Sequence, residues 1–190
     1  MINLLSSRTT QIIALLAGSA VAIVAQDASR LMQEPAIRTA LDAVVRNDPH
    51  FIEEQIRICE IPAPPFHEEA RGRELERLFR QLGLQDVRID KAGNVIGVRP
   101  GEAPHPNLLF QAHLDTVFPE GTNVEVTREG DLLKGPGTGD NCRGLAMMLA
   151  VIEALDEARV KTPGTITFAA DTGEEGSATC AAQRIFSMTA

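Results

Sequence analysis

Apolar residues recur at helical spacing in three stretches of the chain, and a fourth stretch is rich in strong helix formers. The four stretches cover residues 35–46, 50–60, 67–82 and 144–158. Because proline cannot continue a helix, we expect Asn47-Asp48-Pro49 to separate the first stretch from the second. Gly83 follows the third stretch, and glycine is a common helix terminator. The pattern therefore predicts four separate helices.

Extended segments lie between the predicted helices. Short β-prone runs flank turn residues in two places and predict two hairpins, one from residues 87–89 and 95–98 and one from residues 124–127 and 132–133. Two other runs, residues 107–112 and 165–170, lack polar alternation and are predicted to be interior strands covered on both faces. Strands that alternate with helices indicate an α/β sheet.

Polar residues follow directly after both predicted interior strands. His113 and Asp115 follow the first strand, and Glu174 and Glu175 lie close behind the second. Sites in α/β proteins lie at the carboxyl edge of the sheet, so we expect these side chains to meet there.

His113 and Asp115 are two positions apart and project to the same side if the strand continues. Asp115 could then accept the ring N–H of His113 and leave the other ring nitrogen for a metal ion. A His-x-Asp pair without context is a weak signal, and an ordinary surface or core pair explains it as well.

Asp140 ends a glycine-rich loop directly before the helix predicted from residue 144. It could be the N-cap of that helix, or the loop could cradle a phosphate at the helix start. Neither a Walker A motif nor a complete Rossmann fingerprint is present, which argues against the phosphate.

Glu174 and Glu175 are adjacent, so in an extended segment their side chains point in opposite directions. One carboxylate could then bind a metal ion while the other faces a bound water. Taken alone, this dipeptide is better explained as a solvated pair of glutamates.

Together, three segments resemble the zinc exopeptidase family that includes aminoacylase, glutamate-releasing carboxypeptidase, desuccinylase and peptidase T. The segments are His113-Leu-Asp-Thr-Val, Gly137-Thr-Gly-Asp-Asn-Cys-Arg-Gly144 and Asp171-Thr-Gly-Glu-Glu-Gly176. They occur in the order of the family's first metal motif, its bridging-aspartate motif and its catalytic Glu-Glu motif. The resemblance runs from about His50 to the end of the chain.

The resemblance implies a role for each site residue. His113 would be a ligand of one zinc ion, Asp140 the bridge between two, and Glu175 a ligand of the other. Asp115 would orient His113, and Glu174 would be the general base. The resemblance also implies a cis peptide bond after Asp140.

A fold and a reaction are implied as well. The fold would be the N-terminal part of a zinc exopeptidase catalytic domain, with a mixed, mostly parallel sheet flanked by helices. Two zinc ions, with cobalt or manganese as possible substitutes, would hydrolyse a small peptide or an N-acyl amino acid.

This chain ends before the family's two remaining metal ligands and lacks the inserted domain that packs the family's dimer and closes over the substrate. We therefore expect weak or no hydrolysis from these residues alone. The competing interpretation is a non-catalytic exported module that binds a metal ion, calcium included, or another ligand.

Charge and cysteine content narrow the picture further. The net charge of -8 argues against a nucleic-acid partner, because phosphate binding needs a basic face. The three cysteines are an odd number, widely separated and without CxxC spacing, so we expect neither a disulfide framework nor a thiolate zinc site. We predict that Cys59, Cys142 and Cys180 are small, buried residues in the reduced state.

Residues 1–25 have the layout of a secretory signal peptide, with Arg8 before an apolar run that ends at Ala25. We expect cleavage after Ala25, leaving residues 26–190 as an exported, periplasmic or extracellular protein without a stable membrane span. A retained anchor is the alternative, but the run is shorter than the roughly 20 apolar residues that span a bilayer.

Overall fold

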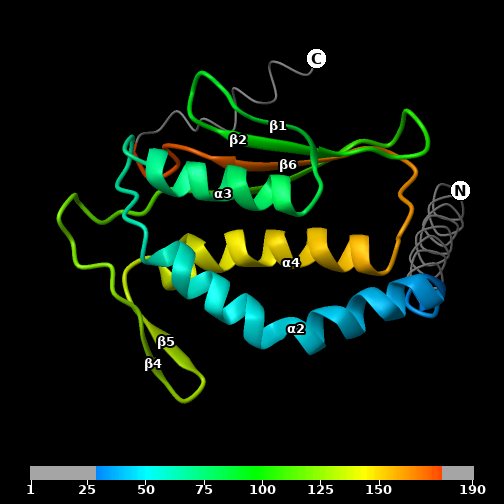
Figure 1. Cartoon of the computed structure of the whole chain (residues 1–190), viewed down its shortest axis with the longest axis horizontal. Coiled ribbons are helices and arrows are strands. Elements are labelled where there is room, and N and C mark those ends of the chain that lie inside the picture. Colours follow the sequence, from blue (N-terminus) through cyan, green and yellow to red (C-terminus); the bar gives the residue numbers. More distant parts are fainter. Residues whose placement is uncertain (1–28, 177–190) are drawn as a thin grey trace, which may run out of the picture.

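The computed structural model describes residues 29–176, which form one sheet with helices layered against it (Figure 1). The predicted signal peptide, residues 1–25, and a further helix predicted to begin near Ser177 lie outside the described residues. Within the described part, no helix is both long enough and apolar enough to cross a membrane.

The sheet is mixed, as expected. Its four strands lie in the order β1 (Gln85–Ile89), β2 (Val95–Arg99), β6 (Ile166–Asp171) and β3 (Leu108–His113). β3 and β6 are parallel, whereas β2 is antiparallel to both of its neighbours. The expectation of a mostly parallel sheet is therefore wrong for the described strands. The turn between β1 and β2 is too short to make a parallel crossover.

β6 is an interior strand, as predicted, with buried residues along almost its whole length. The same prediction is wrong for β3 within residues 29–176, where β3 has one neighbour, and Leu108 at its start is 59% exposed. Only the last two residues of β3, Ala112 and His113, are buried. The apolar composition of β3 therefore did not reveal its place in the described sheet.

Two helices cover the same face of the sheet (Figure 1). They are α3 (Glu69–Gln81) and α4 (Arg143–Glu157), both close to their predicted positions. The core lies between these helices and the sheet. It includes the fully buried side chains of Phe79 in α3, Met148 in α4 and Phe168 in β6. α3 ends as predicted at Gly83, where a φ of 75° lets the N–H of Leu84 reach back to the carbonyl of Phe79 at 3.1 Å.

The first two predicted helices form one continuous helix, α2 (Pro35–Cys59), with Pro49 inside it. The predicted break is therefore wrong. A proline removes one backbone hydrogen bond and bends a helix, and packing of both flanking segments can outweigh that cost. Ala43 before the proline and Phe51 after it are buried, and Figure 1 shows a bent α2 lying along α4.

The second predicted hairpin is present, but its first strand begins at Thr127 and not at residue 124 as predicted. β4 (Thr127–Glu129) and β5 (Leu132–Lys134) pair antiparallel, and Gly130 in the turn between them has a φ of 63°. Figure 1 shows this hairpin projecting away from the sheet beside one end of α2.

A disulfide joins Cys59 at the end of α2 to Cys142 directly before α4. Both residues are fully buried, and their Cα atoms are 5.5 Å apart. The prediction that these cysteines are reduced is therefore wrong. Their sequence separation of 83 residues gives no local signal, and the pairing follows from the packing of α2 on α4. Cys180 lies outside the described residues.

We expect loss of this disulfide to lower the free energy of unfolding by about 2–4 kcal/mol, because the cross-link restricts the unfolded chain. Urea unfolding of Cys59→Ser, Cys142→Ser and the double variant would measure the loss. The double variant should lose no more than either single variant. A double variant as stable as the native protein would contradict the prediction.

An ion-pair network between α2 and α3 predicts a pH dependence. Hydrogen bonds from Arg77 and Arg57 outweigh burial and lower the pKa of Glu74 to about 2. Because this value lies below the ordinary pKa of 4.5, the stabilisation is complete above pH 4.5 and is lost as the pH falls toward 2.

Glu74→Gln should therefore lower the free energy of unfolding by about 1–2 kcal/mol at pH 7, since solvent screens the partly exposed arginines. The difference from the native protein should shrink steadily from pH 4.5 to pH 3 in denaturant titrations. Glu76→Gln is the matched control, because within residues 29–176 Glu76 pairs only with Arg80 on the surface of the same helix, and we expect little change. A pH-independent difference for Glu74→Gln would contradict the assignment.

Candidate metal centre

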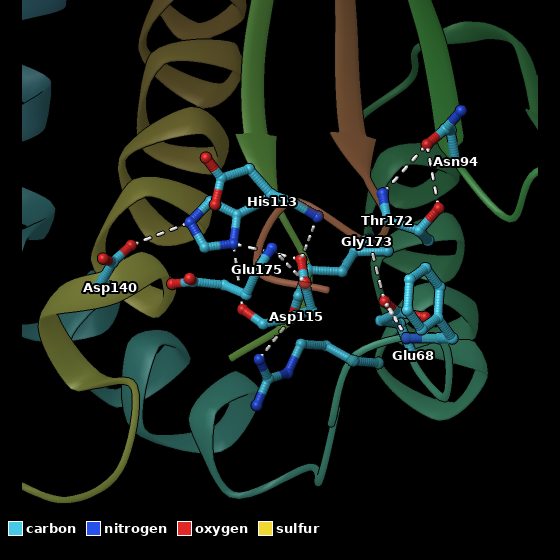
Figure 2. A network of polar contacts seen from close by, with 12 residues as sticks. Glu68, Asn94, His113, Asp115, Asp140, Thr172, Gly173 and Glu175 are labelled. Carbon is cyan, nitrogen blue, oxygen red and sulfur yellow. Dashed lines mark hydrogen bonds and ion pairs between the residues drawn. The ribbon is translucent and has the colours of Figure 1, made fainter. Parts of the chain in front are cut away.

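The parallel pairing of β3 and β6 places two chain segments at one edge of the sheet. In the strand register, His113 lies opposite Asp171, so the loops that follow both strands leave from the same edge. Figure 2 shows the side chains from these loops converging there. The side chains therefore meet at the carboxyl edge of the sheet, as expected.

Four of the predicted site residues come together. Donor atoms of His113, Glu174 and Glu175 lie within 4.8 Å of one another. Asp140, from the loop before α4, places its Oδ1 2.9 Å from Nε2 of His113. The histidine is buried, whereas the side chain of Asp140 is 77% exposed. The cluster thus has one buried ring and an open side toward solvent.

Glu174 and Glu175 lie in a turn, so the alternation of an extended strand does not apply to them. Both carboxylates reach the same cluster of donor atoms. The expected opposite orientation of the two side chains is therefore not what the turn produces.

Asp115 is fully buried and lies against the ring of His113, as expected. Nδ1 of His113 lies 3.1 Å from the carbonyl oxygen of Asp115 and 3.4 Å from its Oδ1, which leaves Nε2 to face Asp140. The carboxylate of Asp115 also accepts the backbone N–H groups of Glu174 and Glu175, at 3.2 and 2.8 Å. Sequence reasoning did not find this second contact, because it joins segments about sixty residues apart.

The charges of the cluster shift the pKa values of its members. Burial lowers the pKa of His113, but the hydrogen bonds that the ring donates to Asp115 and Asp140 outweigh it and raise the value to about 9. Burial and then the charges of Asp140 and Glu174 raise the pKa of Glu175. Crowded carboxylates of this kind repel one another, and a divalent cation would relieve the repulsion.

Asp171 is a buried carboxylate to which sequence reasoning assigned no role. It is fully buried beside His113 at the end of β6, and neither carboxylate oxygen has a hydrogen-bond partner among the described residues. Burial raises its pKa to about 6. An unsatisfied buried carboxylate is uncommon in proteins, and a cation in the neighbouring cluster would stabilise it.

The donor set fits a transition metal. One imidazole nitrogen together with carboxylate oxygens suits zinc, and also cobalt or manganese. Calcium prefers six to eight oxygen ligands, so the central imidazole argues against it.

Asp140 does not cap the following helix. The N-cap of α4 is Cys142, and no side chain makes a capping hydrogen bond there. The peptide bond between Asp140 and Asn141 is cis, as the family resemblance implies. Gln55 of α2 holds this loop by donating a 2.8 Å hydrogen bond to the carbonyl of Thr138.

Comparison with known proteins identifies the family of this fold. Residues 109–187 match the model of peptidase family M20/M25/M40. The uncharacterized protein YqjE of Bacillus subtilis (strain 168) is 33% identical over 141 residues, which cover 68% of this chain and 37% of that protein. Carboxypeptidase G2 of Pseudomonas sp. (strain RS-16) is 35% identical over 113 residues, covering 56% of this chain and 27% of its own length.

Among solved structures, a tripeptidase from Staphylococcus aureus is similar with a TM-score of 0.60 and 27% identity, over 68% of this chain and 37% of the tripeptidase. The chain belongs to the M20/M25/M40 peptidase family. It spans about a third of the length of the curated relatives that it matches.

Proposed function

We propose that this chain contributes part of a two-metal centre that hydrolyses a peptide or N-acyl amide bond. The observation that carries the proposal is the convergence of His113, Asp140, Glu174 and Glu175 at one edge of the sheet. Membership of a peptidase family supports it.

In this proposal, His113 through Nε2, Asp140 and Glu175 would hold the metal ions. Bound zinc ions supply polarisation of the substrate carbonyl and make water a stronger acid. Asp115 fixes the imidazole so that Nε2 faces the site. Glu174, whose side chain is exposed toward solvent, takes a proton from the attacking water and passes it to the leaving amine.

Small peptides or N-acyl amino acids are the proposed substrates. The similar proteins include a cytosol non-specific dipeptidase from Escherichia coli and a succinyl-diaminopimelate desuccinylase from Corynebacterium glutamicum. An aminoacylhistidine dipeptidase from Vibrio alginolyticus has a similar structure, with 28% identity and a TM-score of 0.54. All three names describe cleavage of an amide bond in a small molecule.

We expect Glu174→Gln, made in the complete gene product, to lower kcat by about 10²–10⁴-fold, because the glutamine cannot accept a proton. The assay is turnover of dipeptides and N-acyl amino acids, with the metal content measured in parallel. Glu174→Gln should retain its metal, whereas His113→Ala should lose metal and activity together. Asp42→Asn on the exposed side of α2 is the control and should leave both unchanged.

Metal uptake without turnover in any variant, the native protein included, would favour a non-catalytic metal-binding module. No uptake of a transition metal would contradict the proposed centre itself.

We also propose that the protein is exported. The apolar run that ends at Ala25 supports export, and so does the disulfide between Cys59 and Cys142, because disulfides persist in oxidising compartments.

The N-terminal sequence of protein recovered from the periplasm or the medium should begin at Gln26. Replacing Leu15 and Leu16 in the apolar run with arginine should keep the protein inside the cell, because a signal peptide needs an uninterrupted apolar segment. Replacing Leu41 and Val45 of α2 instead would control for the added charge, since both residues are exposed. An exported protein that still begins at Met1 would contradict cleavage after Ala25.

A further inference from the structure

The turn that carries Glu174 and Glu175 is held by an unusual set of contacts (Figure 2). The four consecutive backbone N–H groups of residues 172–175 each donate to a side-chain oxygen. Asn94 accepts from Thr172 at 3.0 Å, Glu68 from Gly173 at 3.0 Å, and Asp115 from Glu174 and Glu175. We call Asn94, Glu68 and Asp115 the cradle of this turn.

The three cradle residues come from separate parts of the fold. Glu68 directly precedes α3, Asn94 precedes β2, and Asp115 follows β3. Glu68 is 4% exposed, and the other two are fully buried. Burying a charged carboxylate is costly unless hydrogen bonds compensate it, so each cradle carboxylate favours a turn that presents its N–H groups inward.

Glu68 makes two backbone contacts through one oxygen. Its Oε1 accepts the N–H of Phe66 at 2.8 Å as well as that of Gly173. The ring of Phe66 lies against the glycines of the turn. A Cβ atom on Gly173 would come within 3.0 Å of the ring, and one on Gly176 within 2.6 Å. Glu68 therefore fixes the turn directly and also through Phe66.

Neither neighbour of Gly173 in the turn depends on Glu68 for its own hydrogen bond. The N–H groups of Thr172 and Glu174 have Asn94 and Asp115 as acceptors. Loss of the Glu68 carboxylate would therefore free the middle of the turn while both ends stay attached. The carboxylate of Glu174 follows directly after this freed position.

We propose that Glu68 is a positioning residue of the catalytic turn, which sets where the carboxylates of Glu174 and Glu175 lie. The proposal rests on the proposed function for its catalytic consequence. Glu68 touches no substrate and acts only through the backbone of Gly173 and the ring of Phe66.

The decisive comparison is Glu68→Ala against Glu68→Gln in the complete gene product. Alanine removes the acceptor, whereas glutamine keeps an oxygen at the same place. Because small misplacements of catalytic groups are costly, we expect Glu68→Ala to lower kcat by about 10–100-fold with KM changed less than about threefold. Glu68→Gln should restore kcat to within about fivefold of the native value.

Lost stability alone could also lower activity, so a destabilised control is needed. Leu78→Ala removes a buried side chain from α3, the helix that follows Glu68. Leu78 belongs to a hydrophobic core cluster that contains no residue of the turn 172–176. Assayed well below its melting temperature, Leu78→Ala should keep native kcat. A kcat of Glu68→Ala within twofold of the native value, or an equal loss in Leu78→Ala, would overturn the proposal.

A second measurement separates this proposal from the proposed function. Amide hydrogen exchange of the segment 166–176, followed by mass spectrometry in the presence of a chelator, reports the turn without metal or substrate. Exchange should be faster in Glu68→Ala than in Glu68→Gln and Leu78→Ala. Faster exchange in Glu68→Ala, combined with a native protein that shows no turnover, would reject the proposed function and retain the positioning role. Unchanged exchange in Glu68→Ala would overturn the positioning role itself.

Discussion

The buried carboxylate of Asp115 is the interaction on which the geometry of the site depends. It meets the ring of His113 on one side and two backbone N–H groups of the catalytic turn on the other. Burial raises the pKa of Asp115, but hydrogen bonds from His113, Glu175 and Glu174 outweigh it and lower the value, so the group is an anion. An anion buried in this way needs all of its partners, and the end of β3 and the turn after β6 therefore cannot shift independently.

Asp140 is held in place by a different set of contacts. Its loop is joined to α2 through the Cys59–Cys142 disulfide and the hydrogen bond from Gln55 to Thr138. α2 in turn packs along α4, which rests on the sheet. The two sides of the metal centre thus belong to different layers of the fold. The contact between Asp140 and His113 joins these two layers. The distance between the layers therefore sets the distance between Asp140 and His113.

Local signals in the sequence predicted much of this fold. α3 with its stop at Gly83, the β1–β2 hairpin and α4 each carry their own pattern, and all three are present. α2 was predicted as two helices because Pro49 is also a local signal, and the packing against α4 that overrides it is not visible in the sequence. The disulfide was missed for the same reason, since only the folded chain brings Cys59 and Cys142 together.

The sequence predicted some residues of the candidate site and missed others. His113, Glu174 and Glu175 stand in short motifs behind predicted strands, so the sequence predicted that they meet at one edge, and the family resemblance added Asp140. Glu68 and Asn94 were missed because their contacts with the turn span 105 and 78 residues. Neither residue type carries a motif of its own. A glutamate near the start of an amphipathic helix is most simply a solvated charge, and only its burial shows otherwise.

The carboxylates of the cradle add to the negative charge around the site. Glu68 and Asp115 place two carboxylates behind a turn that already presents two others, and Asp140 and Asp171 add a further pair nearby. Arg71 is a cation close to Asp115 and Glu68, but it donates its hydrogen bonds to the carbonyls of Cys59, Ile61 and Leu114. The hydrogen bonds of the cradle satisfy its carboxylates but do not neutralise them. Divalent ions at the open side of the cluster would balance this charge, so the contacts that hold the turn would also contribute a negative potential that attracts metal ions.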